Sequence, residues 1–425
     1  IQAFLKSKET KNAGWLIGGR IVQMILSLFV GLLTARYLGP SNYGLISYGS
    51  AFVTFFSALC NLGLNSVIIK DFVDNPNEQG KAIGSALLMR FVSSVLSVFA
   101  MVGIALIADK NEPVTIAVVA LCGVGSVFHI FETFNYWFQY NYQSKITAMA
   151  TLVAYVITSL YKIVLLIFQK NVTWFAFATS VDYIVVAIFL LIAYKKYQGT
   201  KLEFSLSKSK SLLNISRHYI LSSLMVAIYG QTDKLMLKQM IDETEVGYYA
   251  IATAVCAMWT FVLQAIIDSV YPTILRLKNQ DNIVYEKKNR QLYAIVFYIS
   301  CLVSVVFFIF GSFIIELLYG KDYLPAVDVL KIVTWYTAFS YLGVARNAWV
   351  VSEGMQKYLK VIYACAAVLN VLLNFVLIPI MGSVGAAIAT LITQVFTSFI
   401  LPLFIKGMRK NARLMLEAIL LKNIK

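Results

Sequence analysis

Twelve long apolar runs determine what this chain can fold into. Each run is at least as long as the roughly 20 residues that an α-helix needs to cross a hydrocarbon layer. Within each run the apolar residues follow one another without the alternation of a barrel strand, which predicts helices. The runs cover residues 12–38, 40–70, 80–108, 113–141, 144–169, 172–195, 211–241, 243–272, 286–318, 324–352, 356–379 and 382–406. The sequence therefore predicts an all-α integral membrane protein with twelve transmembrane helices.

The composition excludes an ordinary soluble domain. Hydrophobic residues make up 59% of the chain and charged residues 13%, whereas soluble domains have about 45–50% and about 25%. The five cysteines all lie in apolar runs without CxxC spacing, and the two histidines are too few for a histidine-based metal centre. We therefore expect no metal site, no cofactor and no disulfide framework.

Signatures of an enzyme are missing from the sequence. It contains neither a Walker loop nor a His-Glu-x-x-His motif, so neither ATP nor a metal-bound water is the expected source of drive or chemistry. The first apolar run is too long for a signal peptide and lacks a small-residue cleavage site. We expect a membrane transporter rather than an enzyme.

The net charge of +15 would suggest nucleic acid in a soluble protein, but the positions of the cations explain it differently. With the N-terminus placed in the cytoplasm, 26 of the 36 Lys and Arg residues fall at cytoplasmic ends of the runs and 6 at outer ends. The positive-inside rule then predicts that both termini are cytoplasmic. No nucleic-acid partner is expected.

Two similar segments indicate an internal repeat. The first is Thr34–Ser47 and the second is Leu237–Ala250, and aligning Gly44 with Gly247 places them 203 positions apart. In both segments an apolar run ends, a short turn follows, and a run rich in small residues begins close to the glycine. The chain is therefore predicted to consist of two structural halves.

The longest charged connector, Tyr194–Arg217, separates the first six runs from the last six. Because each half then starts on the same side of the membrane, the halves are predicted to be parallel repeats related by a pseudo-two-fold axis along the membrane normal. We expect an N-terminal six-helix lobe at residues 1–200 and a C-terminal one at 201–410. The tail at 411–425 is basic and amphipathic but too short to span, so we expect it in the cytoplasmic interface.

Basic residues inside the runs are the first candidates for a binding site. A charge inside a membrane is costly, so each is paired, snorkelling or functional. Arg90 can snorkel from its position near the cytoplasmic end of its run, and Lys331 can pair with Asp328 three residues earlier. The group as a whole predicts a shared polar cavity for an anion such as diphosphate. The substrate-binding candidates are Arg20, Lys162, Arg346, Arg90 and Lys331.

Acidic residues inside the runs are candidates for ion coupling or gating. Asp233 is flanked by Lys234 and Lys238, so the alternative for it is a local charge cluster near the interface. Asp182 lies in the middle of its run with no basic residue one turn away. A buried carboxylate without a partner has a raised pKa, which suits proton exchange. A basic partner on another helix would remove this reason. The candidates are Asp233, Asp182, Glu132 and Asp268.

The stretch Phe134–Gln143 mixes aromatic and amide side chains at one end of its run. Aromatic rings can stack on sugar rings while the amides donate hydrogen bonds. An interfacial aromatic belt explains the same residues, and both hypotheses stay open.

Four stretches of the chain resemble the Wzx-type polysaccharide repeat-unit flippases of the MOP superfamily, which also contains MATE exporters and lipid II flippases. The last of the four is shared with MATE-like relatives, so by itself it does not name a substrate. The stretches are Arg36–Gly44, Tyr136–Gln139 leading to Lys145, Thr232–Leu237 followed by Val246–Ala250, and Leu369–Thr390.

The resemblance implies two six-helix lobes around a V-shaped central cavity that opens to either side in turn. It implies transport of an undecaprenyl-diphosphate-linked oligosaccharide, a repeat unit of O-antigen or capsular polysaccharide, from the inner to the outer leaflet of the bacterial cytoplasmic membrane. By this resemblance Arg20, Lys162 and Arg346 hold diphosphate or acidic sugars. An H⁺ or Na⁺ gradient is the expected drive. Membrane lipids, and polysaccharide polymerase or chain-length proteins, are further expected partners.

Rival hypotheses remain at this stage. A MATE-like exporter of cationic compounds requires a neutral or negative cavity. Related lipid II-type flippases often have more than twelve helices. A membrane glycosyltransferase or ligase requires acidic catalytic residues on a large external loop, and no connector between the runs exceeds about 20 residues. A scaffold without transport activity would leave export intact when the three proposed cations are replaced by Ala.

Overall fold

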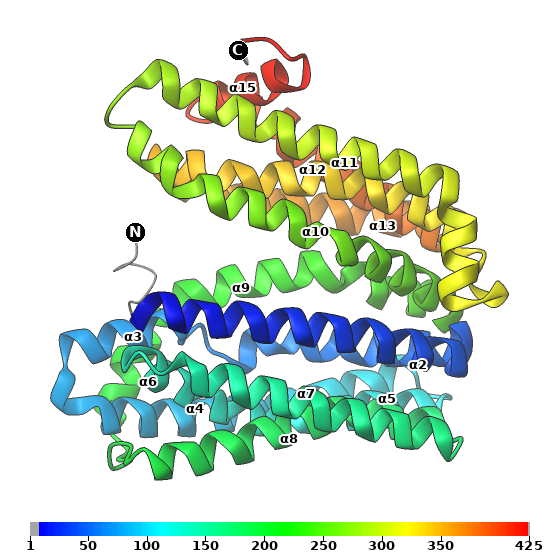
Figure 1. Ribbon diagram of the computed structural model, residues 1–425. Coiled ribbons are helices and arrows are strands. Elements are labelled where there is room, and N and C mark those ends of the chain that lie inside the picture. The colour runs from blue at the N-terminus through cyan, green and yellow to red at the C-terminus, as the bar shows by residue number, and fades with distance from the viewer. Residues whose placement is uncertain (1–7, 424–425) are drawn as a thin grey trace. The chain divides into compact units, whose positions relative to one another are not determined.

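The computed structural model describes the backbone of residues 8–423, and the side chains in that range except those of residues 8–21, 25, 66 and 222. All regular elements in this described part are helical (Figure 1). Eight helices are long and apolar enough to cross a membrane: Val22–Cys60, Pro76–Ala108, Pro113–Tyr140, Ser144–Ile167, Val172–Lys196, Glu243–Leu277, Asn282–Tyr319 and Lys357–Phe404. The predicted all-α membrane fold is confirmed.

Two of these helices are broken at a glycine, and each therefore corresponds to two predicted runs. Helix α2, Lys8–Cys60, leaves helical geometry at Gly39, with φ 71° and ψ 174°. Helix α13, Lys357–Val395, does so at Gly382, with φ 56° and ψ −134°. A positive φ is accessible to glycine at little cost, and a proline close to each glycine, Pro40 and Pro379, removes a helical N–H donor.

Helices α9, Leu206–Met240, and α12, Ala326–Ser352, are also long but less apolar than the eight. Six of the eight helices are unbroken, and the two broken ones count as two segments each. Together with α9 and α12 this gives twelve segments among the described residues, in agreement with the predicted number. The second predicted run was too long at its end, because α2 stops at Cys60 and a separate short helix begins at Asn65.

The chain packs as two compact units, each with its own core. Unit 1 contains Ile1–Leu38 and Leu45–Gln231. Its aromatic core includes Phe72, Phe134 and Phe138, all of them fully buried. Besides parts of α2 and α9, its elements are α3 Asn65–Asp74, η1 Pro76–Glu78, α4 Gln79–Ala108, α5 Pro113–Gly123, η2 Val124–Glu132, α6 Thr133–Tyr140, α7 Ser144–Ile167 and α8 Val172–Lys196.

Unit 2 contains Gly39–Gly44 and Thr232–Lys425. Helix α12 is its central helix and packs against α10, α11 and α13. Buried residues of α12 such as Leu342 and Trp349 lie in the core of the unit. Its remaining elements are α10 Glu243–Leu277, α11 Asn282–Tyr319, η3 Lys321–Tyr323, the π-helical turn η4 Phe396–Ile400, α14 Leu401–Phe404 and α15 Arg409–Ile419.

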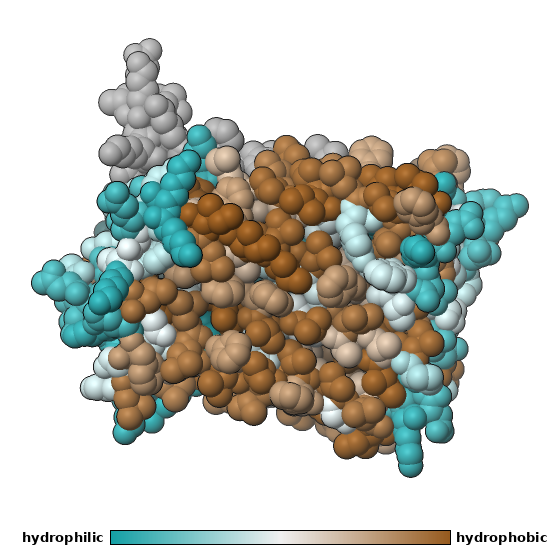
Figure 2. All heavy atoms as spheres, turned by 90° about the horizontal axis from the view of Figure 1, so that it is seen from below, coloured by the Kyte–Doolittle hydropathy of each residue, from teal (hydrophilic) through white to brown (hydrophobic). Residues whose placement is uncertain are grey.

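The surface has the polarity that a bilayer requires. One face carries a broad hydrophobic band with hydrophilic residues gathered at its ends (Figure 2). On α4 alone, Leu96, Phe99 and Ile107 are 63%, 73% and 83% exposed. Large apolar side chains that protrude in such number are stable in contact with lipid rather than water.

The division between the units lies at Gln231–Thr232, within α9, and not at residue 200 where the connector suggested it. The beginning of α9 is tied to unit 1 by charges, since Lys208 Nζ lies 3.0 Å from Asp71 Oδ1 and 2.9 Å from Glu78 Oε2. The residue just before α9 is also bound to unit 1, because the Ser205 N–H donates to Ser85 Oγ at 3.0 Å. A charged connector marks where a chain leaves the membrane, not where its packing changes.

The two segments of the sequence repeat contact each other within unit 2. A Cβ atom on Gly44 would collide with the carbonyl of Glu243, and one on Gly247 would collide with the carbonyl of Pro40. The Ser41 hydroxyl also donates to Glu243 Oε1 at 3.0 Å. We call Gly39–Gly44 together with Glu243–Gly247 the glycine clasp. The glycines are required because the two backbones approach within contact distance.

Replacing Gly247 by Ala is expected to destabilise the protein by about 1–3 kcal/mol, because the added methyl group must displace the Pro40 backbone. Thermal unfolding of the purified protein measures the change. Gly311→Ala on α11 is the matched control: its Cβ would make ordinary contacts at 3.5 Å with Val327 and 3.8 Å with Leu330. A melting temperature that is equally unaffected in both variants would show that the clasp is not close-packed.

Candidate functional site

A 3₁₀ segment interrupts the fourth predicted run, which the sequence predicted as one continuous helix. Segment η2 is nine residues long, longer than most 3₁₀ helices. The Ser180 hydroxyl from α8 donates to the Leu121 carbonyl at 2.5 Å and accepts from the Gly125 N–H at 2.9 Å. These are the two groups that would bond to each other in an α-helix, so the inserted hydroxyl explains the change of geometry.

Arg90 on α4 is the centre of a polar cluster beside this segment. It is 1% exposed, so it does not snorkel. Its guanidinium donates to Asn61 Oδ1, to Thr133 Oγ1 at 2.8 Å and to the His129 carbonyl at 3.2 Å. These bonds connect α4 to the turn after α2, to η2 and to the first residue of α6. Arg90 thus holds four segments of unit 1 together.

The same arginine contacts the side chain of His129. Arg90 Nη2 lies 3.1 Å from His129 Nδ1, and His129 Nε2 lies 3.1 Å from Glu132 Oε2. The imidazole ring therefore lies between the guanidinium of Arg90 and the carboxylate of Glu132. The edge of the His129 ring also contacts Tyr183, with ring centroids 5.0 Å apart.

Lys162 on α7 and Asp182 on α8 form the second charged part of unit 1. Both are half-buried, and the lysine attracts the carboxylate from the neighbouring helix. Asp182 is therefore not the isolated carboxylate that its own helix suggests. Glu132 repels Asp182, which places this pair next to the Arg90 cluster.

Asp233 on α9 lies in a buried cage of hydrogen-bond donors in unit 2. The side chain is 6% exposed. Its Oδ1 accepts from Asn374 Nδ2 at 2.6 Å, and its Oδ2 accepts from the hydroxyls of Tyr249 and, at 2.8 Å, Thr390. Asn370 Nδ2 donates to the same threonine at 3.0 Å. All donors of this cage come from α10 and α13.

The cage partners were missed by sequence reasoning. Asn370 and Asn374 are fully buried and lie one helical turn apart in an apolar run. Two amides at this spacing point to the same side of a helix, and that is the signal that could have identified them. Asn374 Oδ1 is buried without a hydrogen-bond partner, so the cage retains one free acceptor oxygen.

Arg346 on α12 is buried, with 3% of the residue exposed. Among the described residues its guanidinium donates one hydrogen bond, from Nη1 to the Thr397 carbonyl at 3.0 Å in the π-helical turn η4. Its Nε is buried without a partner. In the part of the chain that the structure describes, no carboxylate lies within ion-pair distance of this guanidinium.

The other candidates have different surroundings. Lys331 Nζ lies 3.0 Å from Asp328 Oδ1, as its spacing indicated, and 5.6 Å from the centre of the Phe308 ring. Asp268 is exposed and accepts from Gln264 Nε2 at 2.8 Å. The Arg20 side chain lies outside the described residues. Asp233 and Arg346 share no hydrogen-bond partner.

The aromatic stretch is mainly part of the core of unit 1. Phe134, Trp137 and Phe138 are buried, and the Phe134 ring stacks on Tyr194 with centroids 4.2 Å apart. These three rings are therefore not available as a platform for sugars or as a belt in contact with lipid. Tyr142, at 64% exposed, is accessible.

Helices long and apolar enough to span a bilayer, with ionisable side chains enclosed among them, define a multi-pass membrane protein. The chain belongs to the family of polysaccharide biosynthesis proteins, whose pattern matches residues 10–278. The capsular polysaccharide biosynthesis protein CapF of Staphylococcus aureus is 20% identical over 397 residues, which are 90% of this chain and 96% of that protein.

Two solved structures share the fold. The lipid II flippase MurJ in an inward closed conformation has a TM-score of 0.68 at 15% identity, covering 95% of this chain and 90% of that one. An inward-facing multidrug resistance MATE transporter of the MOP superfamily has the same TM-score at 13% identity, covering 94% and 98%. The resemblance drawn from the sequence motifs is confirmed at the level of the family, and the two solved structures share its fold.

Proposed function

We propose that this chain is a flippase that moves an undecaprenyl-diphosphate-linked oligosaccharide from the inner to the outer leaflet of the bacterial cytoplasmic membrane by alternating access. Membership in the polysaccharide biosynthesis family supports the saccharide part of this substrate. The lipid II flippase that shares the fold supports translocation of a lipid-linked sugar. The observation that supports a negatively charged group on the substrate is the environment of Arg346.

A buried guanidinium with one carbonyl partner is an incomplete arrangement. Removing a charge from water costs several kcal/mol unless an opposite charge and hydrogen bonds compensate for it. Arg346 has a free Nε and no carboxylate partner in the described part of unit 2. A substrate phosphate supplies both the negative charge and the acceptor oxygens that are missing, and arginine binds phosphate with two parallel bonds.

The remaining cations divide into two groups. Lys162 is half-buried and has a single carboxylate neighbour, so we retain it as a second substrate contact, and Arg20 as a third on the basis of its sequence position. Arg90 and Lys331 already have their partners within the protein. We assign those two a structural role and leave them out of the proposed substrate site.

We assign ion coupling to Asp233. Its carboxylate and the free Asn374 oxygen are the kind of ligands that a hard cation prefers, and the carboxylate can equally take a proton. The cage is buried and joins α9, α10 and α13. Binding H⁺ or Na⁺ there would change the charge that these three helices enclose. Asp182 and Glu132 are the corresponding candidates in unit 1.

The distribution of cations supports a cytoplasmic location of both termini. Membrane lipids are the surrounding partners in this arrangement. Interaction with polysaccharide polymerase or chain-length proteins stays a prediction. A MATE-like exporter of cations is the alternative, because the fold matches both kinds of transporter equally well. The uncompensated charge of Arg346 favours the anionic substrate over a cationic one.

Genetic complementation tests the proposal. Deletion of the gene is expected to abolish surface polysaccharide and to cause lipid-linked repeat units to accumulate on the cytoplasmic side, and the intact gene restores export. Proteoliposomes with purified protein and a labelled lipid-linked oligosaccharide then test translocation directly. Normal surface polysaccharide in the deletion strain, or efflux of cationic dyes in place of lipid translocation, would contradict the proposal.

A further inference from the structure

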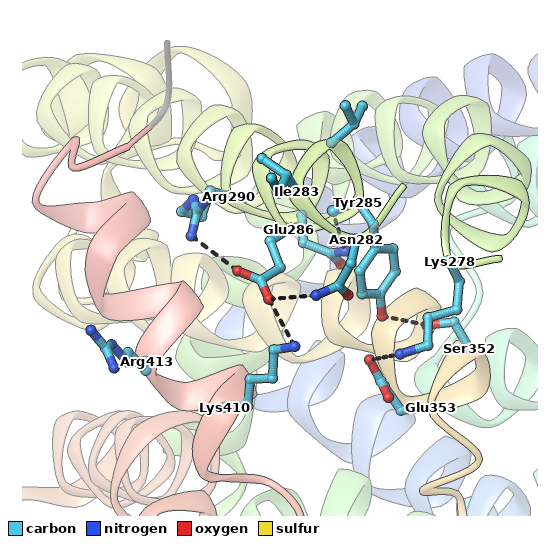
Figure 3. A network of polar contacts seen from close by, with 12 residues as sticks. Lys278, Asn282, Ile283, Tyr285, Glu286, Arg290, Ser352, Glu353, Lys410 and Arg413 are labelled. Carbon is cyan, nitrogen blue, oxygen red and sulfur yellow. Dashed lines mark hydrogen bonds and ion pairs between the residues drawn. The ribbon is translucent and has the colours of Figure 1, made fainter. Parts of the chain in front are cut away.

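Helix α15 near the C-terminus is docked along α11 and not free. Its buried residues Asn411, Ala412, Met415 and Ala418 face the core of unit 2. Lys410 Nζ lies 2.7 Å from Glu286 Oε1, and this pair is part of the network in Figure 3. The apolar face of α15 is thus covered by protein. What remains accessible is its opposite face.

Contacts with α11 give the position of α15. Glu286 of α11 contacts Lys410, Arg290 contacts Glu417, and the Tyr298 hydroxyl donates to the carbonyl of Ile419 at 2.7 Å. On α11 no charged residue occurs from Leu292 through Ile315, so its entry into the hydrocarbon layer is expected near Leu292. Helix α15 therefore packs beside the part of α11 where this entry is expected.

The accessible face of α15 changes character along the helix. Arg409, Arg413, Leu416 and Leu420 follow one another at helical spacing on one face. Arg413 is 81% exposed at its side chain, while Leu416 and Leu420 are 41% and 61% exposed. We call these four residues the α15 stripe. The cations occupy the first half of the stripe and the leucines occupy the second half.

The acid on α15 does not neutralise this face. Glu417 accepts from Arg290 Nη1 at 2.9 Å as well as from Arg413 Nε at 2.9 Å. Its charge is therefore shared with a buried arginine of α11. Figure 3 shows Arg413 on α15 apart from the Glu286 network. The stripe keeps a positive excess, and Lys422 just beyond it is exposed.

We propose that the α15 stripe is a binding surface for anionic phospholipids of the leaflet in which α15 lies. The arginines contact headgroup phosphates while the leucines contact the adjoining acyl chains. A surface that combines cations with exposed leucines, next to the expected membrane entry of α11, fits the boundary between anionic headgroups and hydrocarbon. This inference rests on α11 spanning the membrane and not on the identity of the transported substrate.

Local lipid composition next to α15 tests the proposal. A bimane fluorophore is attached at Leu421→Cys, in full-length protein whose five native cysteines are replaced by Ala. The protein is reconstituted into vesicles of phosphatidylcholine and phosphatidylglycerol, with brominated chains on one lipid or the other. Brominated phosphatidylglycerol is expected to quench at least about twofold more per molecule, because each basic residue near an anionic surface contributes roughly 1 kcal/mol.

Arg409→Gln with Arg413→Gln is expected to bring the quenching ratio of the two lipids to about one. Arg290 still holds Glu417 in this variant, so total quenching stays unchanged and reports that α15 remains docked. Lys110→Gln with Lys321→Gln is the matched control, since both lysines are exposed and far along the chain from α15; it should keep the original ratio.

Three results would overturn the proposal: a ratio of one in the unchanged protein, no quenching by either brominated lipid, or a ratio that the two arginine changes leave intact. No substrate is present in these vesicles. A failed flippase assay and a failed lipid assay are therefore separate outcomes.

Discussion

Asp233→Asn is expected to reduce transport to less than about a tenth of the normal rate while the protein still folds. Asparagine has nearly the same volume, but it carries no charge, and its amide nitrogen cannot accept the bonds that one carboxylate oxygen now receives. A buried carboxylate in a membrane helix is costly and is retained where its charge is used. Translocation in proteoliposomes under an imposed ion gradient gives the rate.

Asp322→Asn provides the control for this change. Asp322 lies in the short η3 turn of the same unit and is exposed, so losing its charge should leave transport unaffected. Normal gradient-driven transport by the Asp233→Asn protein would mean that the carboxylate serves packing alone.

The same variant distinguishes the two possible coupling ions. An ion that binds only the folded protein stabilises it, by about 2.7 kcal/mol when its concentration is 100 times its dissociation constant. If Na⁺ binds in the cage, thermal stability rises in NaCl but not in KCl, and Asp233→Asn abolishes the rise. If a proton binds, the two salts act alike and transport follows the pH gradient. A sodium effect that persists in the variant would place the ion elsewhere.

Arg346→Ala is expected to lower export at least about tenfold without lowering the melting temperature of the protein. The guanidinium has one carbonyl partner and no ion pair in the described residues, so its removal relieves a buried charge instead of breaking a salt bridge. Arg346→Lys keeps the charge but not the planar fork, and it should recover export only in part. Export and thermal unfolding are measured on the same variants.

Arg90→Ala is the informative comparison, because Arg90 is equally buried but donates to three partners, although its Nε also lacks a partner. Losing its bonds to Asn61, Thr133 and His129 leaves their polar atoms without a partner, and breaking such a buried network costs about 3–5 kcal/mol. We expect this variant to be depleted from the membrane. If Arg346→Ala shows the same loss of stability, Arg346 is a structural residue as well and the anionic site loses its support.

Much of the fold follows from the sequence because it depends on local properties. The run 80–108 corresponds to α4 at Gln79–Ala108, and the run 172–195 corresponds to α8 at Val172–Lys196. The gaps between the predicted runs 12–38 and 40–70, and between 356–379 and 382–406, lie at or beside Gly39 and Gly382, where the two long helices break. The repeat of Gly44 and Gly247 was also visible, although their mutual contact was not.

The breaks that depend on a second helix were not predictable. Nothing in residues 113–141 indicates the 3₁₀ segment, because the hydroxyl that intercepts the Leu121–Gly125 bond comes from Ser180 on α8. The cage of Asp233 was predicted only in part. The sequence identified the acid, but not its amide partners, which lie about 140 residues later. Asp182 gained a charged neighbour from α7 for the same reason.

By itself the sequence determined that this chain is a membrane protein, which apolar segments are long enough to cross the bilayer, and which charged side chains lie within those segments, since hydropathy and helix length are summed residue by residue. Only the tertiary structure decided which of those charges have partners. Arg90 and Arg346 are alike in the sequence, and they differ because Arg90 donates to three partners from other segments and Arg346 donates to one. The energy of a buried charge depends on its neighbours in space, and these are set by packing.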